Sequence, residues 1–264
     1  MAEQTKDPVV PRPAATILLV RDGANGIEVF MVKRHHQIDF VAGALVFPGG
    51  RVDEGDNDAI LRDHADGGEE WTGILRAMGA AAIREAFEES GILIARDAET
   101  NKLVTAERLA RLVPFRKALE KHEIALAELL RRERLKLAYD QLVHFAHWIT
   151  PANMPKRFDT HFFLAQSPVG HEGRHDGRES VDSTWITPAA AIADRERWKV
   201  IFPTKANLLK LAESRTVADA ISRARSTMPV AVTPWVEHGA NGPVLRIRED
   251  AGYKQTHASM KDEM

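Results

Sequence analysis

The sequence has 264 residues, of which 44% are hydrophobic and 28% are charged, a composition typical of a globular protein with a substantial apolar core. The formal net charge of −2 gives no reason to expect a nucleic acid or an anionic membrane as the main partner, and no apolar run approaches the ~20 residues of a membrane-spanning helix. Cysteine is absent, which excludes disulfides, thiolate zinc sites and cysteine nucleophiles; together with a polar, proline-rich N-terminus unlike a secretory signal, this predicts a cytoplasmic protein.

The N-terminal half alternates predicted strands with helical segments. Residues 1–13 are expected to form a flexible tail. A hairpin is predicted to turn at Asp22-Gly23, and Pro48-Gly49-Gly50 is predicted to end a short third strand. We expect strands at 14–23, 26–34, 43–47 and 92–95, and helices within 57–79 and over 80–90, the last of them ended by Gly91.

The C-terminal half adds further strands and longer helical segments. We expect strands at 145–150, 159–166 and 183–187, a loop at 168–180, and helices within 105–140, 188–194 and 203–225. Strands paired as hairpins and interrupted by helices predict an α+β fold, in which helices cover both faces of a mixed β-sheet. The helical segments at about 57–79 and 105–140 are interpreted as insertions in one domain of residues 14–252, followed by a polar tail of residues 253–264.

Three glutamates crowd the end of the helix predicted over residues 80–90. Because an α-helix turns by ~100° per residue, Glu85, Glu88 and Glu89 fall within an arc of ~100° on one face of it. Like charges at this spacing destabilise a helix, whereas carboxylate oxygens suit a hard divalent cation such as Mg²⁺. The alternative for the pattern E-x-x-E-E alone is a solvated acidic helix face.

The residues around the glutamates favour the metal site. Arg84 precedes Glu88 by four positions and can orient its carboxylate. Upstream lies the glycine turn of "FPGGRVDEGD", where a carbonyl of Gly49 or Gly50 could approach the same cation. The sequence therefore predicts a cation between this turn and the end of the helix.

Taken together, "GGRVDEGD…REAFEESGI" resembles the Nudix box, G-x5-E-x7-R-E-U-x-E-E-x-G-U, where U is a bulky apolar residue. The matching residues are Gly50, Arg84, Glu85, Glu88, Glu89, Gly91 and Ile92. Asp56 stands where the family has glutamate, and Ala86 where a larger apolar residue is usual. Between Asp56 and Arg84 lie 27 residues, 57 to 83, in place of the family's seven.

The interrupted box and the segments 29–50 and 148–168 resemble one branch of that family, the coenzyme A and acyl-coenzyme A diphosphatases. This resemblance implies a pyrophosphohydrolase that uses Mg²⁺ or Mn²⁺ to cleave a nucleoside diphosphate linked to another moiety, with coenzyme A or acyl-coenzyme A as the first choice. An ADP-ribose or dinucleotide diphosphatase is the alternative within the family. A non-catalytic Nudix-like nucleotide sensor or interaction module is the alternative of another class. The C-terminal "KDEM" does not match a peroxisomal signal.

The resemblance also implies roles for individual residues. Glu85, Glu88 and Glu89, with Gly50, are expected to hold the metal, and Arg84 to act with them. Glu179, six residues before Trp185, is the candidate general base, because a loop glutamate often occupies that position in the family. Glu85 is the alternative base and Asp182 a third candidate.

Further residues are candidates for contact with the substrate. Arg34, Phe47 and Arg51 are expected to contact the substrate. Arg34, Arg51, Lys156 and Arg157 could hold phosphates, and for each of the four the alternative is a solvated surface cation. The sequence leaves the oligomeric state open, a homodimer included.

Two histidine patterns are interpreted without a metal. "HEGRH", residues 171–175, matches the zinc-protease pattern H-E-x-x-H, but the glycines and proline around it predict a loop and not the helix which that chemistry needs. His144 and His147 alternate poorly for a metal site and are expected to be sheet or interface residues.

Overall fold

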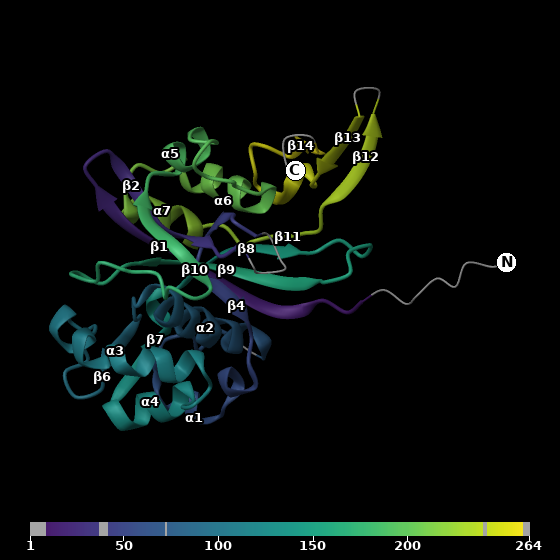
Figure 1. Ribbon diagram of the computed structural model, residues 1–264. Helices are drawn as coiled ribbons and strands as arrows, with labels where there is room; N and C mark the ends of the chain where they lie inside the picture. Colours follow the sequence, from purple (N-terminus) through teal and green to yellow (C-terminus); the bar gives the residue numbers. More distant parts are fainter. Residues whose placement is uncertain (1–8, 37–41, 72, 240–241, 261–264) are drawn as a thin grey trace.

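The computed structural model in Figure 1 describes residues 9–36, 42–71, 73–239 and 242–260. Its centre is a mixed β-sheet with β1 and β9 paired in parallel near the middle. The strand order is β10 (Ser180–Ile186), β2 (Gly26–Arg34), β1 (Arg12–Gly23), β9 (Phe158–Gln166), β8 (Val143–Ile149) and β11 (Ala231–Val232), with β3 (Leu45–Val46) on β2 and β4 (Gly49–Arg51) on β1. The predicted hairpin is present, with Asp22 opposite Ile27 in the antiparallel pair of β1 and β2.

The sheet is buried on both faces. Along β1, Ile17 and Leu19 pack into one hydrophobic cluster, whereas Leu18 and Val20 pack into a second cluster on the other face. Successive side chains of a strand point to opposite faces, so a strand covered on both sides becomes a continuous apolar run. This explains why "TILLV" shows no polar alternation.

Helices form one layer on each face of the sheet, as Figure 1 shows. The first layer contains α1 (Ile60–Asp63), α2 (Ile74–Glu85), α3 (Ala106–Glu120), α4 (Leu126–Glu133) and a small sheet of β5 (Ala65–Asp66), β7 (Leu135–Ala138) and β6 (Ala95–Asp97). The second layer contains α5 (Pro188–Ala193), α6 (Phe202–Leu211) and α7 (Val217–Arg225). The predicted α+β architecture, a mixed sheet between two helical layers, is confirmed.

Several predicted boundaries differ from the structure. The predicted helical segment 105–140 ends in strand β7, because "LKLA" is too short for its periodicity to separate helix from strand. Strand β6 begins at Ala95, where the predicted strand 92–95 ends. Strand β1 begins at Arg12, inside the predicted tail, whose residues 1–8 lie outside the described part of the chain.

The C-terminal residues form a second small sheet, and part of the predicted polar tail of residues 253–264 contributes to it. Strands β12 (Trp235–Gly239), β13 (Gly242–Arg246) and β14 (His257–Ser259) form an antiparallel sheet. Tyr253 is buried, donates from its hydroxyl to Asn207 Oδ1 at 2.9 Å and accepts from Trp148 Nε1 at 2.7 Å. The prediction is therefore wrong for residues 253–260, and residues 261–264 lie outside the described structure. Among the described residues, no helix has the length and apolarity required to cross a membrane.

Candidate active site

The predicted acidic helix end is present, but its last turn is wider than an α-helix. Helix α2 continues into a π-helical turn over Ala86–Ser90, and Gly91 ends it in the left-handed conformation at φ 73°. π-Turns inside helices occur frequently at functional sites. Glu88 and Glu89 lie in this turn and are buried, with 8% and 7% of their surface exposed. The solvated acidic face considered as the alternative is therefore excluded.

A cavity of about 350 Å³ lies over this turn and collects most of the predicted site. Its lining is predominantly charged and comes from β2, β4, α2, the π-turn and the loop before β10. The predicted residues that line it are Arg34, Gly50, Arg51, Arg84, Glu85, Glu88, Glu89 and Glu179. Sequence segments separated by more than a hundred residues therefore meet in one concave surface.

Arg84 connects the two halves of the interrupted box. Its guanidinium donates to both carboxylate oxygens of Asp56, at 2.9 and 3.0 Å, and to Glu85 Oε1 and Glu88 Oε2 at 2.9 and 3.2 Å. Asp56 also accepts from the backbone N–H of Asp53 at 2.8 Å. Asp56 is therefore engaged in holding Arg84, and the loop before the insertion returns to the helix after it.

The glycine turn fits closely against the glutamates. The backbone N–H of Gly49 donates to Glu89 Oε2 at 3.1 Å. A Cβ at Gly50 would lie 2.3 Å from Glu85 Oε1, closer than side-chain carbons approach other atoms. A residue without a side chain is thus required where β4 meets the end of α2.

Burial makes the carboxylates costly to ionise. Desolvation raises the pKa of Glu85 and of Glu88 to about 7, against an ordinary value of 4.5, although Arg84 opposes the shift. The pKa of Glu89 is raised well above 4.5 by burial and by the neighbouring Glu85. Burial lowers the pKa of Arg84, but Asp56 and the two nearest glutamates outweigh it, so its pKa rises overall.

The donor set fits a hard divalent cation. Glu88 Oε1 is buried and has no hydrogen-bond partner among the described residues. An unpartnered carboxylate oxygen inside a cavity is available to coordinate a cation. Glu85, Glu88 and Glu89 line one cavity, where Glu89 contacts Gly49 and Glu85 lies beside Gly50, and oxygen donors are those that Mg²⁺ and Mn²⁺ prefer.

The loop before β10 brings Glu179 to the cavity rim. Asp176 accepts from the backbone N–H groups of Glu179 and Ser180, at 2.8 and 3.0 Å, and so fixes the turn. Glu179 is exposed and lines the cavity. Asp182 is absent from the described lining, and its Oδ2 lies 3.8 Å from Arg197 Nη2. The geometry therefore favours Glu179 over Asp182 as a candidate base.

Sequence reasoning missed the contribution of α3 to the site. Arg116 donates to the carbonyls of Glu88 and Arg174, both at 2.7 Å, and so links the π-turn to the loop. At the end of α3, Glu120 lines the cavity and its Oε1 accepts from Arg178 at 2.7 Å. Asp176-Gly177, a pair typical of turns, is the local signal that would have located this part of the site; the other contacts join distant segments and leave no local pattern.

Phe47 lies outside the charged cavity, in an apolar cavity beside it. The second cavity, of about 240 Å³, is lined by Phe47, Trp148, Phe162 and other apolar residues. It shares Arg34, Thr16 and Gly49 with the charged cavity, so the two adjoin.

The remaining predicted motifs lie away from the charged cavity. Arg157 donates to the carbonyls of Thr150 and Val9, and neither Arg157 nor Lys156 belongs to the described lining. The loop conformation predicted for "HEGRH" is confirmed. His171 Nε2 lies 2.9 Å from the Val104 carbonyl, while His175 Nδ1 contacts Ser183.

Comparison with known proteins agrees with this geometry. The family model of the NUDT19 Nudix domain matches residues 73–205. The crystal structure of a NUDIX hydrolase from Alicyclobacillus acidocaldarius is 30% identical and aligns with a TM-score of 0.68, over 81% of this chain and 96% of that chain.

Two curated proteins are also similar. The acyl-coenzyme A diphosphatase NUDT19 of Xenopus laevis is 22% identical over 222 residues, 69% of this chain and 58% of the relative. The putative nudix hydrolase 7 of Caenorhabditis elegans is 28% identical over 194 residues, 73% of this chain and 57% of the relative. The chain thus spans less than two thirds of the length of these two relatives. With the family model, the solved structure and the site in agreement, the chain belongs to the Nudix hydrolase family, near the acyl-coenzyme A diphosphatase branch.

Proposed function

We propose that this hydrolase is a metal-dependent pyrophosphohydrolase that cleaves a nucleoside diphosphate linked to another moiety, with coenzyme A or acyl-coenzyme A as the leading substrate. The observation that carries the proposal is one charged cavity lined by Glu85, Glu88 and Glu89, in which Glu89 and Glu85 contact the Gly49-Gly50 turn. Nudix hydrolases use divalent metal ions, and this is where the chain offers oxygen donors for one.

The three glutamates, with the Gly50 carbonyl, would hold Mg²⁺ or Mn²⁺. A cation held there offsets the negative charge of a diphosphate and lowers the pKa of bound water. Two features of the chain support this fit: the unpartnered Glu88 Oε1 and the raised pKa values of the three carboxyl groups.

The remaining site residues would orient the glutamates, attract the phosphates and accept a proton. Arg84 orients Glu85 and Glu88, and Asp56 holds Arg84 in place. Arg34 and Arg51 line the cavity, where their positive charges can attract the phosphates. Glu179 takes the proton of the attacking water, with Glu85 as the alternative base.

The neighbouring apolar cavity supports a substrate with a large non-reacting part. Its apolar walls, including Phe47, adjoin the charged cavity at Arg34. A diphosphate in the charged cavity would leave an attached planar or aliphatic group beside these walls. Similarity to the acyl-coenzyme A diphosphatase of Xenopus laevis supports coenzyme A derivatives as the proposed substrates of this chain, ahead of ADP-ribose or dinucleotides.

Product analysis tests the proposal. The purified chain is incubated with coenzyme A, an acyl-coenzyme A, ADP-ribose and a dinucleotide, each with MgCl₂, with MnCl₂ or with EDTA, and the products are identified by mass spectrometry. We expect cation-dependent cleavage of the diphosphate in the coenzyme A compounds. Cleavage of ADP-ribose or dinucleotides alone would establish the alternative substrate class, and no cleavage of any compound would favour the nucleotide sensor.

Matched variants connect the activity to the site. Glu88→Gln and Glu89→Gln are each expected to abolish the cation-dependent turnover while the fold persists. Glu107→Gln is the control, because Glu107 is an exposed residue of α3 paired with Arg111. Full turnover in either of the first two variants would contradict the metal role of the glutamates.

A further inference from the structure

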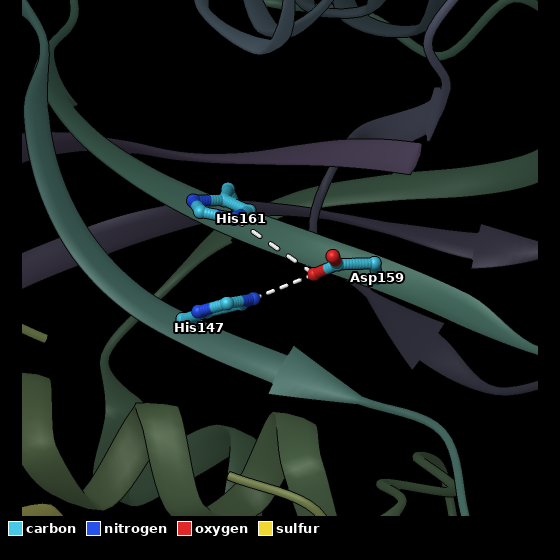
Figure 2. A group of neighbouring side chains, drawn as sticks. All are labelled: His147, Asp159 and His161. Atoms are coloured by element: carbon cyan, nitrogen blue, oxygen red, sulfur yellow. Dashed lines mark hydrogen bonds and ion pairs between the residues drawn. The ribbon is translucent and has the colours of Figure 1, made fainter. Parts of the chain in front are cut away.

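A second group of metal-ligand residues lies on strands β8 and β9, apart from the glutamates. Figure 2 shows His147 on β8 facing Asp159 and His161 on β9. One potential ligand atom from each of the three residues lies within 4.8 Å of the others. His147 Nε2 is 2.5 Å from Asp159 Oδ1, and His161 Nε2 is 3.8 Å from the same oxygen. Three donors therefore converge on one small volume.

The strand register explains why these side chains share a face. His147 is directly opposite His161 in the antiparallel pair, and Asp159 precedes His161 by two residues on the same strand. A bulge places Phe145 as an extra residue between His144 and Ala146, so His144 and His147 point to the same face although three positions separate them. Without the bulge, His144 and His147 would point to opposite faces, which was the argument against a metal site; with it, both point to the same face.

His144 is placed to orient His161. His161 Nδ1 lies 2.9 Å from His144 Nε2, and the two rings stack with centroids 4.8 Å apart. When His161 Nδ1–H donates to His144, the lone pair of His161 Nε2 is directed toward Asp159. Metal-ligating histidines are commonly held in this way through their second ring nitrogen.

We propose that His147, Asp159 and His161 bind a Zn²⁺ ion, with His144 as a positioning residue and one coordination position left to solvent. Two imidazoles and one carboxylate form a donor set that Zn²⁺ accepts readily, whereas Mg²⁺ prefers oxygen donors alone. The three side chains are 18%, 35% and 14% exposed, which shelters the site and still lets an ion enter.

The zinc site is separate from the glutamate centre. Phe158 and Thr160 of β9 line the charged cavity, and alternation along the strand directs Asp159 and His161 to the opposite face. A zinc ion would join β8 to β9 behind the cavity wall, where it supports the wall without touching a substrate. Zinc occupancy is therefore expected to raise the melting temperature and to leave the need for Mg²⁺ unchanged.

Metal titration of the tag-free, EDTA-stripped full chain tests this inference. Co²⁺ serves as a spectroscopic probe, and Zn²⁺ affinity is measured by competition with a chromophoric chelator in excess Mg²⁺. We expect one equivalent of Zn²⁺ to bind, and Co²⁺ to give visible absorption that Zn²⁺ displaces. His147→Gln, Asp159→Asn and His161→Gln should each lose this binding, and His144→Phe should weaken it by ~10- to 100-fold.

Two controls separate the result from trivial causes. His238→Gln, at an exposed residue of β12, should keep full zinc binding, and so should Glu88→Gln at the glutamate centre. Melting curves in EDTA verify the fold of each variant. If His161→Gln does not fold, Asp159→Asn becomes the deciding variant, because the Asp159 side chain is 35% exposed and its substitution disturbs the core least. The proposal is overturned if the wild-type chain binds no zinc, if Asp159→Asn binds it with unchanged affinity, or if only Glu88→Gln abolishes the binding.

Discussion

Replacing Glu88 by glutamine tests whether the buried carboxylates are built for a cation. Glu88 is 8% exposed, and burial raises the pKa of its carboxyl group from the ordinary 4.5 to about 7. Glutamine has nearly the same shape and can still accept the hydrogen bond from Arg84, but it cannot ionise. The substitution therefore removes the energetic cost of a buried negative charge and little else.

The sign and size of the effect follow from the two pKa values. Below pH 4.5 the carboxyl group is protonated in both the folded and the unfolded chain and costs nothing. As the pH rises from 4.5 to about 7, the unfolded chain ionises first, so the folded state loses stability, and the loss is complete above pH 7. At 1.36 kcal/mol per pKa unit the full cost is roughly 3 kcal/mol at pH 8 and below ~1 kcal/mol at pH 5.

Thermal melting in EDTA measures this difference. At pH 8, Glu88→Gln should melt about 6 to 12 °C above the wild-type chain, and at pH 5 the two should nearly coincide. Added MgCl₂ should then stabilise the wild-type chain at pH 8 much more than the variant. The reasoning fails if the variant melts below the wild-type chain at pH 8 in EDTA, or if MgCl₂ stabilises both equally. Glu107→Gln, at an exposed surface pair, should melt like the wild-type chain throughout.

Three further substitutions probe other parts of the site. Gly50→Ala places a Cβ 2.3 Å from Glu85 Oε1, so steady-state kinetics should show kcat/KM lowered by ~10²-fold or more, and an unchanged rate would contradict the close fit. Asp56→Ala leaves Arg84 without its bidentate partner and should cost ~3 to 5 kcal/mol of unfolding free energy in urea titrations; a loss below ~1 kcal/mol would show that the pair is dispensable. Glu179→Gln should lower kcat by ~10²- to 10⁴-fold with little change in KM, whereas wild-type kcat would shift the role of base to Glu85.

The parts of the site that are local in sequence could be predicted, and those that depend on distant contacts could not. Arg84, Glu88 and Gly91 follow one another on a single helix end, so their spacing was readable. The contact of Arg84 with Asp56 and that of Arg116 with Glu88 both join residues 28 positions apart, which no local pattern specifies.

The same distinction explains the errors in the fold. The hairpin of β1 and β2 was predictable because its two strands are adjacent and apolar. Tyr253 was assigned to a tail because its neighbours in sequence are polar, whereas its burial depends on Trp148 and Asn207. The bulge at Phe145 was equally hidden, because it arises from pairing with β9, and it reverses the direction in which His144 points.

The charge balance of the cavity bears on the choice between an enzyme and a sensor. Among the described residues of the lining, Arg34, Arg51 and Arg84 are outnumbered by carboxyl groups, and burial raises the pKa of Glu85, Glu88 and Glu89. A nucleoside diphosphate is itself an anion: Arg34 and Arg51 attract it, but the more numerous carboxylates of the lining repel it when they are ionised. Binding of such a ligand in this cavity is therefore expected to need a divalent cation whether or not the ligand is cleaved. Cation-dependent binding alone cannot separate the two functions, and the decisive measurement is the appearance of a cleaved diphosphate among the products.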